Sequence, residues 1–104
     1  MVVIWSDDAK QDLKNYYKNS NIITPGKVEK YNNDLVEYVD SLSTSPELGK
    51  ELYSYHNIVI RQLLFQMHRI LYFIDNNEII IIQVSYYSRS LDNIIKAIKK
   101  YFND

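Results

Sequence analysis

The chain has 104 residues, of which 46% are hydrophobic and 24% are charged, and its formal net charge at pH 7 is -1. This length allows one domain with one core, and the apolar content excludes a disordered chain. The absence of cysteine excludes disulfides, thiolate metal sites and a cysteine nucleophile, and it fits a reducing cytoplasm. The longest aliphatic run, Ile79 to Ile82, is too short to cross a membrane, so we expect no membrane partner.

A short strand and a helix are predicted at the N-terminus. Val2 to Trp5 is a β-type run. Ser6 then has the features of a helix N-cap, and the two acidic residues after it suit the positive end of a helix dipole. Apolar residues recur at helical spacing after this point, so we expect a first helix from Asp7 to Lys18.

A second, longer helix is predicted to follow a short connection from Asn19 to Ile23. Thr24-Pro25 is a typical helix start, because a proline there loses no useful N–H group. An apolar stripe continues to Leu42, and the residues Ser43 to Pro46 end the helix. Two amphipathic helices with so short a connection form an antiparallel hairpin, whose apolar stripes need a sheet to cover them.

Three strands and a last helix are predicted in the second half. The strands are IVIRQLLF, MHRILYFI and IIIIQVSYY, and the polar run Asp75 to Glu78 is a hairpin turn between the last two. The four isoleucines are apolar on both faces, which predicts a central strand. Ser90 with Asp92 then caps a helix that contains Ile94 and Ile98. The predicted order is βααβββα, an α+β fold.

All three arginines, Arg61, Arg69 and Arg89, lie in this strand region, where a cation has to be matched by the fold or by a ligand. No acidic residue occurs from Leu52 to Ile74 or from Ile79 to Leu91. One explanation is a basic face that attracts phosphate or an acidic peptide. The other is that strands exclude acids.

Short segments along nearly the whole chain carry a resemblance to a known family. They are Val3-Ile4-Trp5-Ser6 with Ala9 and Asp12-Leu13, Ser45-Pro46-Glu47-Leu48-Gly49, Ile60-Arg61-Gln62-Leu63, His68-Arg69-Ile70-Leu71-Tyr72, and Ile81-Ile82-Gln83-Val84 leading to Arg89. In this order they resemble the RelE/ParE family of bacterial toxins from type II toxin-antitoxin modules. The resemblance implies a single toxin domain over residues 1–104, with a small, mostly antiparallel sheet packed on an α-helical hairpin.

The resemblance also implies a growth-inhibiting toxin with a cognate antitoxin as partner, in a toxin-antitoxin hetero-oligomer. ParE-like members poison DNA gyrase, and we favour this protein-binding function. RelE-like members are ribosome-dependent mRNA endonucleases, and a degenerate member would keep antitoxin binding alone. The classes share one fold, so fold does not decide between them or whether the chain is an enzyme.

A ribonuclease of this kind would need a base, an acid and a cation that stabilises the phosphorane. The family pattern then gives Arg69 as the phosphate stabiliser, Arg89 as a second one and Tyr86 as the acid. Arg61 and Tyr87 would bind substrate, the latter by stacking on a base. Arg61 has a second interpretation, a salt bridge or carbonyl clamp within the fold.

Several features count against the ribonuclease. Many members have histidine where this chain has Tyr86, and a tyrosine with a pKa near 10 is a poor base at neutral pH. Strict alternation puts His68 on the opposite sheet face from Arg69, and His56 falls in a predicted loop. The sequence pI of about 6.1 disfavours a polyphosphate ligand. The two histidines lack the spacing of a zinc site, so we expect neither a metal nor a cofactor.

Overall fold

The structure, a computed structural model, describes residues 1–19 and 25–103. Most of the predicted connection, with Thr24 of the second helix start, lies outside the described residues. The elements are β1 (Val2–Trp5), α1 (Asp7–Asn19), α2 (Pro25–Asp40), the 3-10 helix η1 (Ser41–Ser43), β2 (Lys50–Tyr55), β3 (Ile58–Phe65), β4 (His68–Asp75), β5 (Glu78–Tyr86) and α3 (Leu91–Tyr101). The α+β class is confirmed, and the structure has one strand, β2, more than the predicted order.

The five described strands form one sheet in the order β1-β5-β4-β3-β2. Only β1 is parallel to its neighbour, so the sheet is mostly antiparallel, as the resemblance implies. The middle strand is β4, whereas the isoleucine strand β5 lies one place further out, between β1 and β4. Its pairing with β1 covers only Glu78 to Ile81. The rest of β5 has no described strand on its outer side.

Two-residue turns join the antiparallel strands. The predicted turn is confirmed: Asn76 and Asn77 both have positive φ, which suits asparagine and matches the twist of a hairpin. His56 and Asn57 form a turn of the same kind between β2 and β3. The predicted loop around His56 is therefore the tip of a hairpin.

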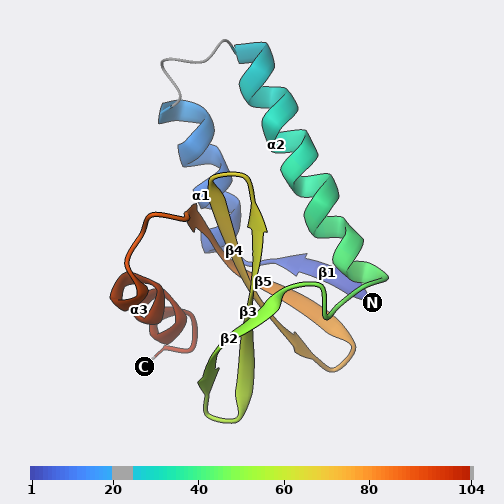
Figure 1. The fold of residues 1–104 in the computed structure, drawn as a ribbon, viewed down its shortest axis with the longest axis vertical. Helices are drawn as coiled ribbons and strands as arrows, with labels where there is room; N and C mark the ends of the chain where they lie inside the picture. The colour runs from blue at the N-terminus through green and yellow to red at the C-terminus, as the bar shows by residue number, and fades with distance from the viewer. Residues whose placement is uncertain (20–24, 104) are drawn as a thin grey trace.

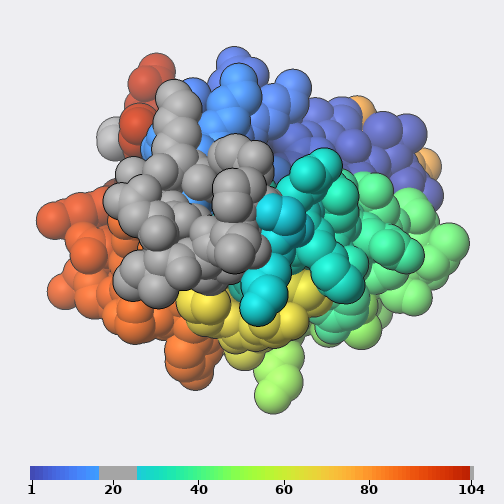
Figure 2. Space-filling view, turned by 90° about the horizontal axis from the view of Figure 1, so that it is seen from above, coloured from blue at the N-terminus to red at the C-terminus, as the bar shows by residue number. Residues whose placement is uncertain are grey.

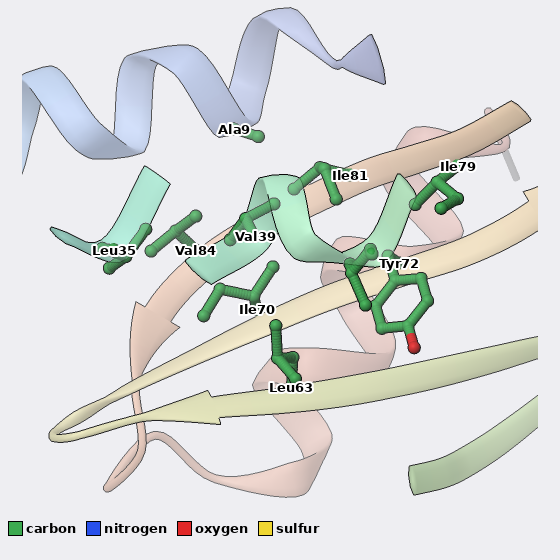
Figure 3. Packing of buried hydrophobic residues seen from close by; sticks show 10 residues of the cluster. Ala9, Leu35, Val39, Leu63, Ile70, Tyr72, Ile79, Ile81 and Val84 are labelled. Carbon is green, nitrogen blue, oxygen red and sulfur yellow. The ribbon is translucent and has the colours of Figure 1, made fainter. Parts of the chain in front are cut away.

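The α1–α2 hairpin covers one face of the sheet and α3 covers the other (Figure 1). Figure 3 shows Ala9, Leu35 and Val39 of the helices packed against Ile70, Ile81 and Val84 of the strands. On the opposite face, the buried residues Ile94 and Ile98 of α3 contact a second cluster with Leu71, Phe73 and Ile82. No helix in the described ranges is long and apolar enough to span a membrane.

Candidate functional site

The predicted site residues gather at the end of the sheet where β4 begins and β5 ends. Cross-strand register pairs His68 with Tyr86 and Arg69 with Ser85. Seen from above, the yellow β3–β4 turn and the orange segment after β5 lie side by side, and the Tyr87 N–H donates a 2.7 Å hydrogen bond to this turn (Figure 2). Because successive strand residues face opposite sides, His68 points to the α1–α2 face and Arg69 to the α3 face.

His68 lies in an aromatic cluster on the α1–α2 face, and only 3% of its surface is exposed. The Tyr86 ring stacks on the imidazole at 4.8 Å between centroids, and the Tyr16 ring meets it edge-on at 4.6 Å. The Tyr31 hydroxyl lies 2.7 Å from Nδ1 of His68. Burial lowers the pKa of His68 and raises the pKa of Tyr31 to about 12. Both groups are therefore neutral at pH 7.

A cavity of about 240 Å³ opens beside this cluster. Its lining residues are Asp12, Asn15, Tyr16, His68, Val84, Ser85, Tyr86 and Arg89. The Asp12 carboxylate accepts a 3.0 Å hydrogen bond from the Val84 N–H at the open part of the β5 edge. Burial raises the pKa of Asp12, although this hydrogen bond and Arg89 oppose the shift. The cavity thus combines a carboxylate, a phenol and a guanidinium.

Arg69 occupies the opposite face of the same sheet end. Its guanidinium lies 5.0 Å from the centre of the Tyr87 ring, a cation–π contact. Its Nε is buried without a hydrogen-bond partner in the described part of the chain, and so are Gln62 Oε1, Gln83 Oε1 and Ser85 Oγ. In the strand register, Ser85 pairs with Arg69, whereas Gln62 and Gln83 pair with Leu71.

Arg61 is engaged by the fold. Its Nη1 donates a 2.8 Å hydrogen bond to the Gly49 carbonyl, and its Nη2 lies 3.5 Å from Glu51 Oε1. The Tyr72 hydroxyl, which points away from the aliphatic core in Figure 3, donates to the Pro46 carbonyl and accepts from the Gly49 N–H, each at 2.8 Å. The contacts of Arg61 with the Gly49 carbonyl and with Glu51 are those of a carbonyl clamp within the fold, which was the second interpretation of this residue.

The structure brings Tyr86 and Arg89 to one cavity and leaves Arg69 with Tyr87 on the other face. The expectation that His68 and Arg69 face opposite sides is confirmed by the packing. Sequence reasoning missed the contact of His68 with Tyr86 and the place of Asp12 in this cavity. Within residues 1–19 and 25–103, no group of three histidine, cysteine or acidic side chains could hold a metal ion.

Comparison with solved structures shows the fold in three toxin-antitoxin proteins. The chromosomal ParDE toxin-antitoxin system of P. aeruginosa matches with a TM-score of 0.71 and 22% identity, over 83% of this chain and 95% of that one. The toxin-antitoxin complex RelBE2 of Mycobacterium tuberculosis matches with a TM-score of 0.58 and 21% identity, over 85% of this chain and 92% of that one. The YoeB dimer of Staphylococcus aureus matches with a TM-score of 0.56 and 22% identity, over 84% of this chain and 97% of that one. No curated protein sequence matches the chain.

A family profile is more specific. The profile described as the ParE toxin of the type II toxin-antitoxin system, parDE, matches residues 3–91, a range that includes the sheet from Val3 onward, the α1–α2 hairpin and the cavity residues. The match covers well over half of the chain, in agreement with the solved structures. The chain therefore belongs to the ParE toxin family of type II toxin-antitoxin systems.

Proposed function

We propose that this toxin inhibits growth by binding DNA gyrase and that a cognate antitoxin neutralises it. The ParE profile supports the gyrase target, and one solved structure with the same fold is a ParDE system. The RelBE2 and YoeB-YefM structures are toxin-antitoxin complexes, which supports an antitoxin partner for this chain. We further propose that residues 1–104 act as one toxin domain in the cytoplasm.

One observation carries the choice of a binding function. A ribonuclease needs a base close to the group that stabilises the phosphorane. Arg69 faces α3, whereas His68 and Tyr86 face α1 and α2, and the His68 ring is buried and bonded to Tyr31. Of the three predicted catalytic residues, Arg69 thus lies across the sheet from Tyr86 and Arg89, which favours an activity that does not need all three together.

A supercoiling assay with purified gyrase tests this proposal. We expect the folded toxin to inhibit supercoiling in proportion to its concentration and a stoichiometric amount of antitoxin to restore the activity. Ribosome-bound mRNA should stay intact at the same toxin concentrations. Unchanged supercoiling at toxin concentrations that arrest growth would contradict the gyrase target.

The mRNA endonuclease remains the second candidate, because Arg89 and Tyr86 line one cavity together with Asp12. In that enzyme Arg89 would stabilise the phosphate and Tyr86 would protonate the leaving oxygen. Replacement of Arg89 by alanine would then abolish cleavage of ribosome-bound mRNA in a protein that still folds. A result of this kind would replace the gyrase proposal.

A further inference from the structure

A cavity of about 780 Å³ opens between β3 and β4, at the end of the sheet away from His68. The pairing of the two strands ends at Arg61 with Tyr72, and each strand continues for three residues beyond that pair. The β2–β3 hairpin and the β4–β5 turn diverge at their tips (Figure 1). The cavity lining includes Val59, Phe73, Ile74 and Asp75 of the strands and Tyr101 and Phe102 at the end of α3, and we call it the β3–β4 cleft.

The backbone groups that face the cleft follow from the two-residue turns. Residues that flank such a turn bond to each other, and the bonding direction then alternates along each strand. Ile58 flanks the β2–β3 turn and bonds to β2, so the next residue, Val59, directs its N–H and C=O toward β4. Asp75 flanks the β4–β5 turn and bonds to β5, so Ile74 directs its own groups toward β3. Continued pairing would join Val59 to Ile74, but β3 and β4 do not form this pair, and both strand edges stay open.

The side chains around the cleft combine aromatic rings with negative charge. The Phe73 ring lies 5.9 Å from the Tyr101 ring and 5.3 Å from the Phe102 ring, measured between centroids. Asp75 lies two residues beyond Phe73, on the same face of β4, and Glu78 is its cross-strand neighbour. In the described part of the chain, neither carboxylate forms an ion pair. The cleft therefore places an apolar contact surface next to uncompensated negative charge.

We propose that the β3–β4 cleft binds an extended segment of DNA gyrase, which adds to the sheet as a strand. The segment backbone bonds Val59 on one side and Ile74 on the other. One apolar side chain of the segment lies on the aromatic rings, and a lysine or arginine two positions away pairs with Asp75 and Glu78. Strand addition to an open sheet edge is a general mode of peptide recognition, in which main-chain bonds give affinity and alternate side chains give specificity.

The charge of the cleft selects this occupant. The carboxylates of Asp75 and Glu78 repel phosphate groups, so a nucleic acid fits poorly. An enzyme that holds DNA carries lysine and arginine along the path of the phosphates, so its segments have the complementary charge. The inference rests on the proposed function, because it assigns the segment to gyrase. It gives that function a contact at the opposite end of the sheet from the cavity with Arg89.

A matched pair of proline variants tests the strand addition. Val59→Pro removes the N–H that faces the cleft. Ser54→Pro removes the N–H of its cross-strand neighbour, which faces away from β3 at the edge of the sheet. Neither N–H bonds to a described strand, and proline is tolerated at such positions. We expect Val59→Pro to raise the Kd for purified gyrase at least tenfold and Ser54→Pro to change it less than twofold, with thermal melting as the check that both variants fold.

A second pair of variants tests the carboxylates. Asp75→Asn combined with Glu78→Gln removes both charges from the cleft, whereas Glu29→Gln combined with Glu37→Gln removes two charges from exposed positions of α2. We expect the first combination to raise the Kd for gyrase at least tenfold, and the toxin concentration that half-inhibits supercoiling in proportion. The second combination should change both less than twofold. The Kd for the antitoxin, measured by calorimetry, should stay within twofold of wild type in the cleft variants.

The possible failures are distinguishable. If wild-type toxin inhibits gyrase but Val59→Pro and Ser54→Pro bind it equally well, or the two charge combinations do, the inference is overturned and the proposed function stands. Loss of antitoxin binding in the cleft variants with unchanged gyrase binding would also overturn it, because the antitoxin would then be the occupant. If wild-type toxin does not bind gyrase, the proposed function fails, and this inference fails with it.

Discussion

The Tyr72 hydroxyl links the core to the Pro46–Gly49 segment by two hydrogen bonds. Tyr72 has less exposed surface than any other tyrosine described. Its hydroxyl donates to the Pro46 carbonyl and accepts from the Gly49 N–H. A side chain at position 49 would be crowded, because an added Cβ would lie 2.6 Å from the Tyr72 ring and 2.7 Å from the Gln62 carbonyl oxygen. This crowding gives a structural reason for glycine at position 49, the last residue of the segment Ser45–Gly49 that carries the family resemblance.

Replacement of Tyr72 by phenylalanine tests this link. Loss of the hydroxyl leaves a buried N–H and a carbonyl without their partner, and we expect the free energy of unfolding to fall by about 2 kcal/mol. Urea denaturation measures the change. Tyr101→Phe is the control, because it keeps the ring contacts with Phe73 and Phe102. Equal effects of the two changes would contradict the role of the Tyr72 hydroxyl.

His68 makes stability depend on pH. Its pKa in the folded state is lowered by burial from the ordinary value of 6.5, so the unfolded chain binds a proton more readily than the folded one. The contribution of His68 is fully present above pH 6.5 and is lost as the pH falls toward the lowered folded value. We expect the free energy of unfolding to fall there with a slope of at most about 1.4 kcal/mol per pH unit.

Urea denaturation at a series of pH values checks this expectation. The His68→Gln variant should lose most of the pH dependence between pH 6.5 and the folded pKa. The His56→Gln variant, in an exposed turn, should keep it. A pH dependence that disappears with His56 instead would show that the wrong histidine has been chosen.

At the scale of elements, Asp12 ties α1 to the part of β5 that β1 does not cover. Its carboxylate takes the place of a neighbouring strand by accepting from the Val84 N–H. Open strand edges are commonly protected in such ways. Ser6 also protects this edge of β5, two residues before Val84, because its hydroxyl donates a hydrogen bond to the Ile82 carbonyl. One helix start thus closes the strand edge and forms one wall of the cavity.

Two substitutions of Asp12 separate hydrogen bonding from charge. Asp12→Asn keeps an acceptor for Val84 and removes a charge whose burial is unfavourable, so we expect stability within about 0.5 kcal/mol of wild type or above it. Asp12→Ala removes the acceptor and should cost about 1–3 kcal/mol. Chemical denaturation measures both. Similar losses in the two variants would mean that the charge, and not the hydrogen bond, holds α1 on β5.

The elements with regular apolar spacing were predictable, and β2 was not. Lys50–Tyr55 is an edge strand with an irregular register between Glu51 and Tyr53, so it lacks the alternation of a covered strand. The contact of His68 with Tyr86 was hidden for a similar reason. Counting back from the Asn76–Asn77 turn pairs His68 with Ser85, but an irregularity between Leu71 and Tyr72 shifts the register by one residue. Local sequence patterns do not reveal such shifts.

At the scale of the whole molecule, the two faces of the sheet have different surroundings. The α1–α2 face carries the cavity with Arg89, Tyr86 and Asp12, and the α3 face carries Arg69, whose guanidinium lies over the Tyr87 ring. The sequence showed that these arginines needed partners, and it placed Arg69 in a strand and Arg89 just after the last strand. It could not show their separation, because the side on which a residue after a strand lies depends on the local path of the chain.

The central claim is that the toxin acts on gyrase and not on mRNA. The most direct measurement is induced expression without antitoxin, with plasmid supercoiling and transcript integrity followed in the same cells. We predict growth arrest with disturbed supercoiling and with transcripts that primer extension finds intact at the onset of arrest. Ribosome-dependent cuts at that onset, lost in Arg69→Ala or Arg89→Ala, would contradict the account, and normal growth with folded protein would identify a member that keeps antitoxin binding alone.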